Sequence, residues 1–405
     1  MKSISPERDN KADDNALLCR SLHLDESRPP RLVITQDRST KSKYRGQRWE
    51  LREGLREITT LKRLKACGKV PVAPLVTLRG EQGGTAGYGG LSTCSSVWAC
   101  PVCSAKIASA RQSEVAQVIE WAEKEGYRVS MVTFTQSHKK ENLSFLWDSL
   151  KSGWKALVSG SRWAQFKEQT GLVGYIKATE ITHGVNSYHA HYHAILLHTA
   201  ENIKEKALVF KNGEIMSCED FLFSRWQKGL AKAGVTCSRE RGIDIRTAKE
   251  GDAETLGRYV AKMGTVGMAN EVTLSAFKQA KNGNRTPFQI AKDAVAGDEE
   301  SKRLWWEFER VSKGRRALIF SDGLRDLALL EEEKSDEEIC EEEAGGDVVL
   351  TLSHASWGQV RAHGAYNLLE ALEQGGIYTA RAWLDERKIV WKPPEVGKYR
   401  EPKRE

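Results

Sequence analysis

The sequence of 405 residues lacks any long hydrophobic run. No apolar stretch approaches the ~18 residues that cross a bilayer as a helix, so we expect no membrane-spanning segment. Its first residues, MKSISPERDN, carry charge where a secretory signal needs an apolar core, which favours a cytoplasmic protein. We find no internal repeats. A composition of 40% hydrophobic and 29% charged residues is typical of a soluble globular chain with one large core and appendages, or with two to three domains.

Acidic residues are concentrated in one segment, 331–343, whose sequence is EEEKSDEEICEEE. The net charge is +7, and this segment contributes −8, so the rest of the chain carries +15. Residues 38–69 are rich in Arg and Lys, with Tyr44 and Trp49 between them. Basic residues interleaved with aromatics suit a polyanion whose bases can stack, although a solvated helix face explains this segment alone equally well.

The chain divides by composition and periodicity into five predicted regions. We expect a poorly ordered polar N-terminus at 1–45, a basic helix and a cysteine-rich segment at 46–125, and a large region at 126–330. The acidic run then forms a linker at 331–345, before a mainly helical accessory region at 346–405. Further patterns predict helices at 46–66, 104–125, 142–169 and 218–233, and strands at 127–135, 172–182 and 242–248.

Cysteine is scarce, but four of the eight cysteines are clustered, at Cys67, Cys94, Cys100 and Cys103. A cytoplasmic location argues against a disulfide framework. The two-residue gap between Cys100 and Cys103 lets two thiolates bind one tetrahedral Zn²⁺, and Cys94 and Cys67 can complete a closed structural site. A redox pair in WACPVC is one alternative, but it has no use for two further cysteines; buried cysteines without a ligand are another.

Histidine is also scarce, yet three of the nine histidines, His189, His191 and His193, alternate in the segment YHAHYHAILL. Alternation in a strand places them on one face, which favours metal binding or proton chemistry over a merely exposed polar face. If this strand forms a hairpin with 172–182 around a loop at 184–187, Glu180 lies opposite His191. Imidazoles with a carboxylate and no thiolate suit Mn²⁺ or Mg²⁺ that keeps open positions for a phosphate oxygen.

A later helix, DAETLGRYVAKMG, carries a candidate nucleophile. Tyr259 and Lys262 are three positions apart and share a side of this helix. A tyrosinate could attack phosphorus while the lysine stabilises the developing charge. Taken alone, a helical tyrosine is more often a packing or surface residue.

Five motifs together resemble a known family. HAHYHAILL is similar to the histidine, hydrophobic, histidine motif of HUH endonucleases, and the chain resembles plasmid rolling-circle replication initiators of the single-tyrosine class. The similarity runs in order over roughly 60–330, through GLSTCSSVWACPVCSAKI, MVTFTQSH, ATEITHGVNSYHAHYHAILL, GRYVAKM and TPFQIAKDAVAGD with SKGRRALIFSDGLR. The cysteine cluster also recurs in these relatives.

The resemblance implies an α+β fold in which helices flank a central antiparallel sheet and 126–330 is the catalytic nicking domain. It assigns the divalent metal to His191 and His193 with Glu180 as third ligand, and it ranks His189 below them. Tyr259 becomes the nucleophile. Thr133 and Thr135 belong to the first strand motif, as structural residues or neighbours of DNA.

The chain departs from the family pattern at one position. Relatives place a carboxylate one helical turn before the tyrosine to activate water at termination, and here that position is Thr255. The neighbouring Glu254 is the candidate that remains, although on an ideal helix it points about 140° away from Tyr259.

The resulting hypothesis is a metal-dependent endonuclease that nicks a plasmid origin, keeps the 5′ end as a phosphotyrosine and later rejoins the displaced strand. Its expected cofactors are Mg²⁺ or Mn²⁺ and structural Zn²⁺. Its expected partners are origin DNA, single-stranded or extruded at the nick site, a host helicase and a host polymerase. The alternatives are a transposase or mobilisation relaxase of the same superfamily, and a non-catalytic, zinc-containing DNA-binding regulator.

Overall fold

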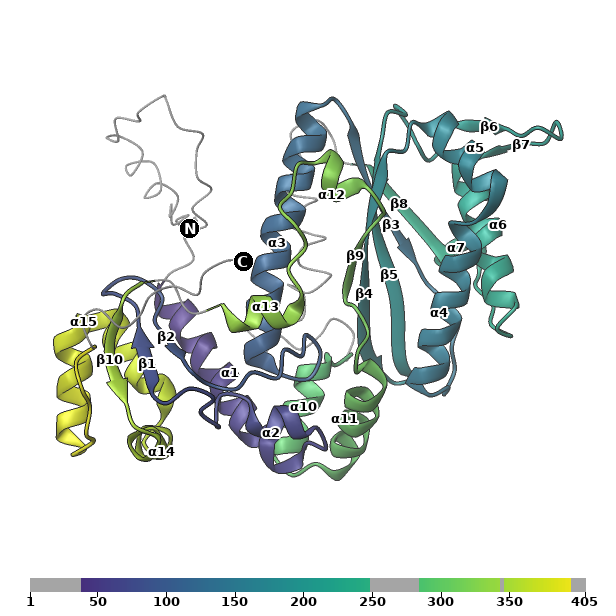
Figure 1. Cartoon of the computed structure of the whole chain (residues 1–405). Coiled ribbons are helices and arrows are strands. Elements are labelled where there is room, and N and C mark those ends of the chain that lie inside the picture. The colour runs from purple at the N-terminus through teal and green to yellow at the C-terminus, as the bar shows by residue number, and fades with distance from the viewer. Residues whose placement is uncertain (1–37, 248–283, 343–345, 395–405) are drawn as a thin grey trace, which may run out of the picture. The chain divides into compact units, whose positions relative to one another are not determined.

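The fold was analysed in a computed structural model, which describes residues 38–247, 284–342 and 346–394 (Figure 1). Its central feature is a five-stranded antiparallel sheet, so the predicted class of helices flanking an antiparallel sheet is confirmed. In sheet order the strands are β8 (Ile243–Thr247), β3 (Arg128–Phe134), β5 (Ser187–His198), β4 (Gly174–Gly184) and β9 (Leu318–Phe320).

Strands β4 and β5 form the hairpin that the sequence predicts. Gly184 pairs with Ser187 across a two-residue turn, and Glu180 pairs with His191, so the predicted register is confirmed. Alternation along β5 then sends Tyr188 and Tyr192 to one face and the histidines to the other.

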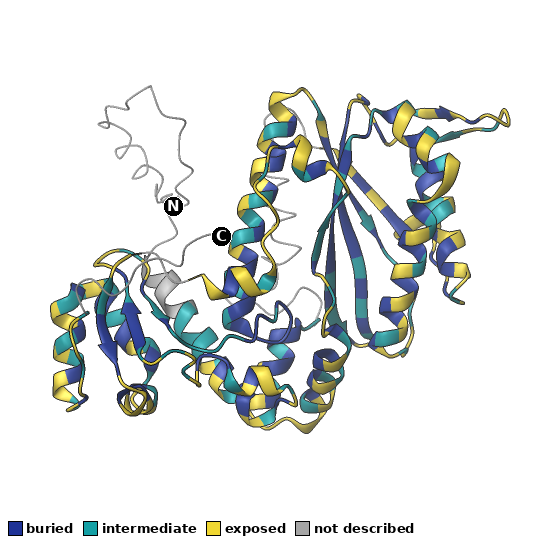
Figure 2. Cartoon of the chain, in the orientation of Figure 1, coloured by how far each residue is buried: buried dark blue, intermediate teal, exposed yellow. Residues whose placement is uncertain are grey.

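The two faces of the sheet are covered by different helices (Figure 1). Helix α3 (Pro101–Lys124) packs Val118 and Ile119 against Ile195 and its neighbours on the face that carries the histidines. Helices α4 (Leu143–Leu157) and α6 (Cys218–Ala231) cover the opposite face. Figure 2 shows that the strands between these layers are largely buried.

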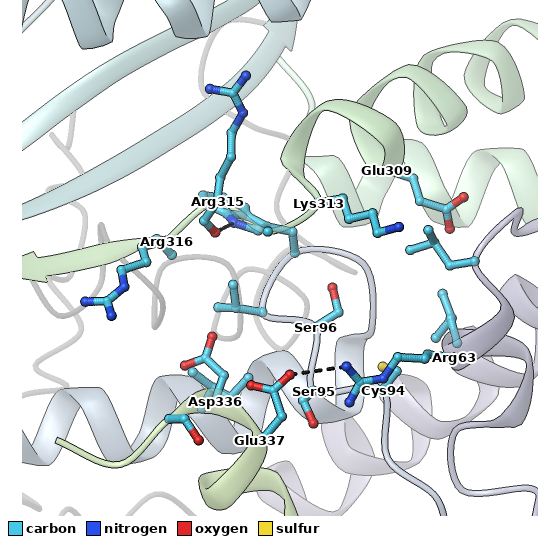
Figure 3. Close-up of a pocket in the computed structure, with 18 of the residues that line it drawn as sticks. Arg63, Cys94, Ser95, Ser96, Glu309, Lys313, Arg315, Arg316, Asp336 and Glu337 are labelled. Carbon is cyan, nitrogen blue, oxygen red and sulfur yellow. Dashed lines mark hydrogen bonds and ion pairs between the residues drawn. The ribbon is translucent and has the colours of Figure 1, made fainter.

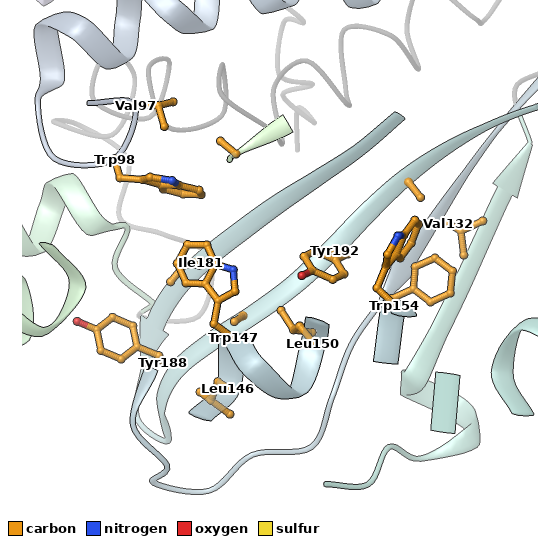
Figure 4. Close-up of a cluster of buried hydrophobic side chains, with 14 of the residues drawn as sticks. Val97, Trp98, Val132, Leu146, Trp147, Leu150, Trp154, Ile181, Tyr188 and Tyr192 are labelled. Atoms are coloured by element: carbon orange, nitrogen blue, oxygen red, sulfur yellow. The ribbon is translucent and has the colours of Figure 1, made fainter. Parts of the chain in front are cut away.

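The core on the α4 side is rich in aromatic side chains (Figure 4). Leu146, Leu150 and Trp154 recur at helical spacing and are buried, and Asn142 caps the helix by accepting a hydrogen bond from the Phe145 N–H at 2.9 Å. Trp154 meets the ring of Tyr192 edge-on, with centroids 5.8 Å apart. This packing holds the tyrosine face of β5 against α4, so that the opposite face, which carries the histidines, is available for a site.

Two predicted helices are interrupted. The helix predicted at 142–169 is α4 followed by α5 (Gly160–Thr170), with a break at Val158 and Ser159 before a glycine of positive φ. The helix predicted at 46–66 is α1 (Arg38–Ile58) followed by the short α2 (Lys62–Ala66). The break at Thr59 and Thr60 exists because their hydroxyls donate to Glu309, a buried carboxylate of α11 (Glu299–Ser312).

A second sheet joins segments from opposite ends of the described chain. Its strand order is β10 (Val348–Leu352), β1 (Val76–Arg79) and β2 (Gly87–Gly89), and helices α14 (His354–Ala362) and α15 (Ala365–Glu386) pack on it. Helix α15 is interrupted at Gly376, whose backbone is not helical. The expected helical character of the C-terminal region is therefore confirmed, and this region shares its sheet with strands that precede α3.

The remaining elements are short. They are β6 (Ala207–Val209), β7 (Ile215–Ser217), α7 (Arg239–Gly242), α10 (Pro287–Val295), α12 (Leu324–Leu327) and α13 (Asp336–Glu341). Among the described helices, none combines the length and the apolar character that crossing a bilayer requires.

Candidate functional site

Glu180, His191 and His193 converge at one point of the central sheet. The Nε2 atoms of His191 and His193 lie 2.6 and 2.8 Å from the same carboxylate oxygen of Glu180. One ligand atom from each of the three residues lies within 4.8 Å of the other two. Two imidazoles and a carboxylate at this separation could hold one divalent cation, and the donor set suits a metal that also binds phosphate oxygens.

Burial at this group is asymmetric. His193 is buried, whereas the side chains of His191 and Glu180 retain about a fifth of their exposure. The group is therefore closed on the side of His193 and accessible on the side of His191. A ligand on a bound metal would approach from the His191 side.

The electrostatics of the group favour metal-binding protonation states. Burial alone would raise the pKa of Glu180, but the hydrogen bonds and charges of His191 and His193 outweigh it and hold that pKa well below its ordinary value. Burial lowers the pKa of His193 despite the opposing effect of Glu180. An ionised carboxylate beside a neutral imidazole is what a divalent metal needs.

Thr133 fixes the orientation of His193. Its Oγ1 lies 3.1 Å from Nδ1 of His193, the residue that it faces across the β3 and β5 pair. A histidine that donates Nδ1–H to an oxygen presents the Nε2 lone pair on its other side. Thr133 thus contacts a candidate ligand, a role that its place in a strand motif did not specify.

His189 is engaged elsewhere. Its Nδ1 lies 2.7 Å from Nε2 of His138, whose own Nδ1 lies 3.2 Å from the carbonyl oxygen of Asn186. Among the described residues, the convergent group contains Glu180, His191 and His193 and not His189. A metal role for His189 stays a prediction. Its contact with His138, the last residue of the motif MVTFTQSH, was not predicted from the sequence.

The nucleophile and its helix lie outside the described residues. Tyr259, Lys262 and Glu254 all belong to 248–283, so their roles stay predictions. The strand before them, β8, pairs with β3, and Asp244 of β8 faces Thr133.

The four clustered cysteines are brought together and buried. The Sγ atom of Cys67 lies 3.9 Å from that of Cys100 and 3.6 Å from that of Cys103, and Cys94 lies 3.7 Å from Cys103. Four thiolates about 2.3 Å from a tetrahedral Zn²⁺ have sulfurs roughly 3.8 Å apart, so the observed spacing fits zinc. Cys67 joins the group although 26 residues separate it from Cys94 in sequence.

Local structure explains why these cysteines meet. Cys67 ends α2, and Cys100 and Cys103 occupy the N-cap and first turn of α3, where the helix dipole favours thiolates. Hydrogen bonding to Cys100 lowers the pKa of Cys103 well below its ordinary value. Cys340 of α13, which seemed isolated in sequence, also interacts with Cys103.

Comparison with known proteins places the chain in a family. A family model described as Replication protein matches residues 91–361. The chain belongs to this replication protein family. The match includes Glu180, both candidate histidine ligands and three of the four clustered cysteines, and it leaves Cys67 outside. Membership confirms the resemblance to replication initiators that the motif order indicates.

Two curated relatives match this replication protein. One, from Streptomyces lividans, is named Protein rep and is 29% identical over 339 residues, with 69% of this chain and 71% of the relative covered. The other, from Streptomyces cyanogenus, is named Neomycin resistance protein and is 28% identical over 172 residues, covering 36% of this chain and 39% of the relative. No solved structure matches the chain.

Proposed function

We propose that this replication protein initiates plasmid rolling-circle replication by nicking one strand of an origin. The observation that carries the proposal is the convergence of His191 and His193 on one oxygen of Glu180, at an accessible point of the sheet. Family membership supports replication as the process. Phosphodiester cleavage is the chemistry that this donor set suits, with Mg²⁺ or Mn²⁺ polarising the scissile phosphate when bound.

In this proposal Tyr259 supplies the nucleophile. Its hydroxyl oxygen attacks phosphorus, the phosphate bond to the 3′ oxygen breaks, and the 5′ end remains attached to the tyrosine. Lys262 stabilises the charge that develops on the phosphate, because the helix predicted from the sequence places it on the same side as Tyr259. The released 3′-OH primes a host polymerase, and a host helicase opens the duplex ahead.

Termination reverses this chemistry. Water first cleaves the bond from phosphorus to the 3′ oxygen at the regenerated origin, which frees a 3′-OH on the displaced strand and leaves a 5′-phosphate on the new strand. That 3′-OH attacks the phosphotyrosine, which closes the displaced strand into a circle, breaks the bond from phosphorus to the tyrosine oxygen and returns the proton to the tyrosine. Glu254 is the proposed base for this water, although on the predicted helix its position points about 140° away from Tyr259.

The four-cysteine group acts structurally in this proposal. Four buried thiolates around Zn²⁺ leave no position for a substrate, so the ion holds α2 and the start of α3 together. Origin DNA is the proposed partner, single-stranded or extruded at the nick, and the cytoplasm is the proposed location.

The experiment uses a labelled single-stranded oligonucleotide that contains the origin, incubated with the zinc-loaded protein and Mn²⁺. We expect an adduct that survives denaturation in the wild type and in Tyr378→Phe, an exposed tyrosine of α15. Tyr259→Phe should form none; if it does, Tyr259 is not the nucleophile.

A second pair of variants tests the metal group. His191→Ala should lose cleavage while retaining most duplex binding, whereas the exposed His363→Ala should behave as wild type. If the protein binds every candidate origin and forms an adduct with none, the proposed enzyme activity is wrong and the protein is a DNA-binding regulator.

A further inference from the structure

A pocket of about 700 Å³ lies beside the four-cysteine group (Figure 3). Its walls come from α2, the loop around Cys94, the loop after α11, and the acidic segment at α13. Six cationic and four anionic side chains line it, so its lining carries a net positive charge. The volume suits a small ligand or a short stretch of a larger one.

Four of the cations are available to a ligand. The side chains of Lys62 and Lys313 are exposed and make no hydrogen bond or ion pair with another described residue. Arg63 and Arg316 are 60% and 67% exposed, and among the described residues each makes one ion pair. The hydroxyls of Ser95 and Ser96 lie between these groups (Figure 3).

The other two cations serve the fold. Arg315 pairs with Asp148 at 3.2 Å and stacks on Trp147, so its guanidinium points away from the pocket in Figure 3. Arg111 is buried and pairs with Glu114 at 3.0 Å and Asp336 at 3.4 Å. Neither is free to bind a ligand.

The acidic segment occupies the exposed arginines. Glu337 pairs with Arg63 at 3.2 Å, as the dashed line in Figure 3 marks. Glu333 pairs with Arg316 at 3.6 Å and also with the buried Arg111 at 3.7 Å. The segment is held in place by Ile339 and Cys340, which are buried in the core. Its carboxylates therefore stay beside the pocket and compete with any anion that enters.

The pocket lies near the candidate metal group. Leu318 lines the pocket and begins β9, where it pairs with Ala178 of β4, and Ala178 pairs in turn with His193. Two strand spacings of about 4.8 Å separate Leu318 from His193, so the pocket wall lies roughly 10 Å from the metal ligands. One short single strand could reach both.

We propose that this pocket binds backbone phosphates of single-stranded DNA next to the nick site, and that Glu333 and Glu337 weaken this binding by occupying Arg316 and Arg63. The proposal rests on the proposed function, since it gives the same substrate a second contact. Phosphates rather than bases are the ligand, because Trp98, the aromatic residue of the lining, is buried and offers no face for stacking.

The test measures binding of a fluorescein-labelled oligothymidylate to the zinc-loaded full chain by anisotropy, as a function of salt. In Glu333→Gln/Glu337→Gln we expect about tenfold tighter binding at low salt and a slope of log affinity against log salt that is steeper by roughly 1.4, since each phosphate newly engaged adds about 0.7. The matched control Glu332→Gln/Glu341→Gln removes the same charge from exposed residues whose side chains make no hydrogen bond or ion pair with another described residue. It should change affinity less than about twofold, because salt screens distant charges.

A complementary pair removes cations. Lys62→Gln/Lys313→Gln should weaken binding about tenfold and flatten the salt slope. The exposed pair Lys228→Gln/Lys232→Gln, in the last turn and at the C-cap of α6, should do neither. Thermal unfolding confirms that each variant is folded.

Two outcomes would overturn the proposal. If the pocket glutamate variant and its control change the affinity for DNA equally, only the net charge of the protein matters. If the pocket lysine variant and its control weaken binding equally, DNA does not enter the pocket. This test measures binding and not cleavage. If the protein forms no adduct and the nicking hypothesis fails, the binding test can therefore still be carried out and interpreted.

Discussion

At the scale of single residues, Thr133 contacts Nδ1 of His193, while Nε2 on the other side of the ring faces Glu180. We predict that Thr133→Val weakens Mn²⁺ binding by about 10- to 100-fold, since groups that orient metal ligands have effects of this size, while Thr133→Ser keeps the hydroxyl and the affinity. Titration of Mn²⁺ followed by electron paramagnetic resonance measures it. Thr135→Val, directly after the same strand and with its hydroxyl bonded to the Arg241 carbonyl, is the control. Equal affinity in Thr133→Val and wild type would exclude the orienting role.

The sequence predicted that Glu180, His191 and His193 meet, and not which residues contact the histidines from other strands and loops. Alternation along β5 gives the face, and the short turn gives the register that places Glu180 opposite His191. Thr133 and His138 are 60 and 51 residues from their histidine partners, and no local pattern specifies that distant pairing.

Lys177 lies on the face of β4 opposite to Glu180, and its burial costs folding free energy. Its ammonium is buried above the rings of Trp154 and Tyr192, 5.0 and 4.3 Å from their centroids, and burial lowers the pKa of Lys177 to about 8. An unfolded lysine has a pKa near ~10.4, so between these values the unfolded chain binds more protons and stability rises with pH.

We therefore predict that Lys177→Met raises the free energy of unfolding at pH 7 by about 1–2 kcal/mol, because desolvation is relieved while a cation–π contact is lost. The gain should shrink as pH rises through 8 towards 10. Urea unfolding at pH 7 and pH 10 measures it, with the exposed Lys155→Met as reference. A gain that is the same at both pH values would contradict the assigned cause.

At the scale of elements, α4 and α6 cross at glycines. A Cβ at Gly153 would lie 2.5 Å from the Trp226 ring, and the Cα of Gly153 lies 2.7 Å from the place of a Cβ at Gly229. Gly153→Ala should cost about 1–3 kcal/mol through overpacking. Gly358→Ala in α14 meets open space and should gain up to about 1 kcal/mol from helix propensity. Thermal unfolding of both variants compares the same substitution with opposite expected signs; equal shifts would refute the packing argument.

Element boundaries were less predictable than element types. The apolar spacing of 46–66 continues through Thr59 and Thr60, and the helix breaks there because Glu309, about 250 residues later, accepts their hydrogen bonds. The spacing of apolar residues predicts which face of a helix is buried. It does not predict a hydrogen bond to a residue so distant in sequence.

At the scale of the whole molecule, the second sheet depends on residues after the acidic segment. A chain that ends at residue 342 would lack β10, α14 and α15, and would expose the apolar side chains of Val76 and Leu78. We predict unfolding at least about 5 °C lower and increased binding of a hydrophobic dye, since losing several buried apolar side chains costs a few kcal/mol. A chain that ends at residue 394 keeps the sheet and should match the full-length protein. Identical melting of both shortened chains would show that the second sheet adds no stability.

The second sheet also sets an order of events during synthesis. Tyr88, at the strand next to β1, bonds the Ala365 carbonyl 277 positions later. At roughly 5–20 residues per second, a ribosome needs about 14–55 s to make the intervening chain. Strand β1 therefore leaves the ribosome long before its partner β10 is made. A messenger RNA that lacks roughly the last sixth of the coding sequence yields a polypeptide that has the candidate metal ligands but lacks β10. The edge of β1 that β10 would cover is then unpaired, and such an edge is a target for chaperones and proteases.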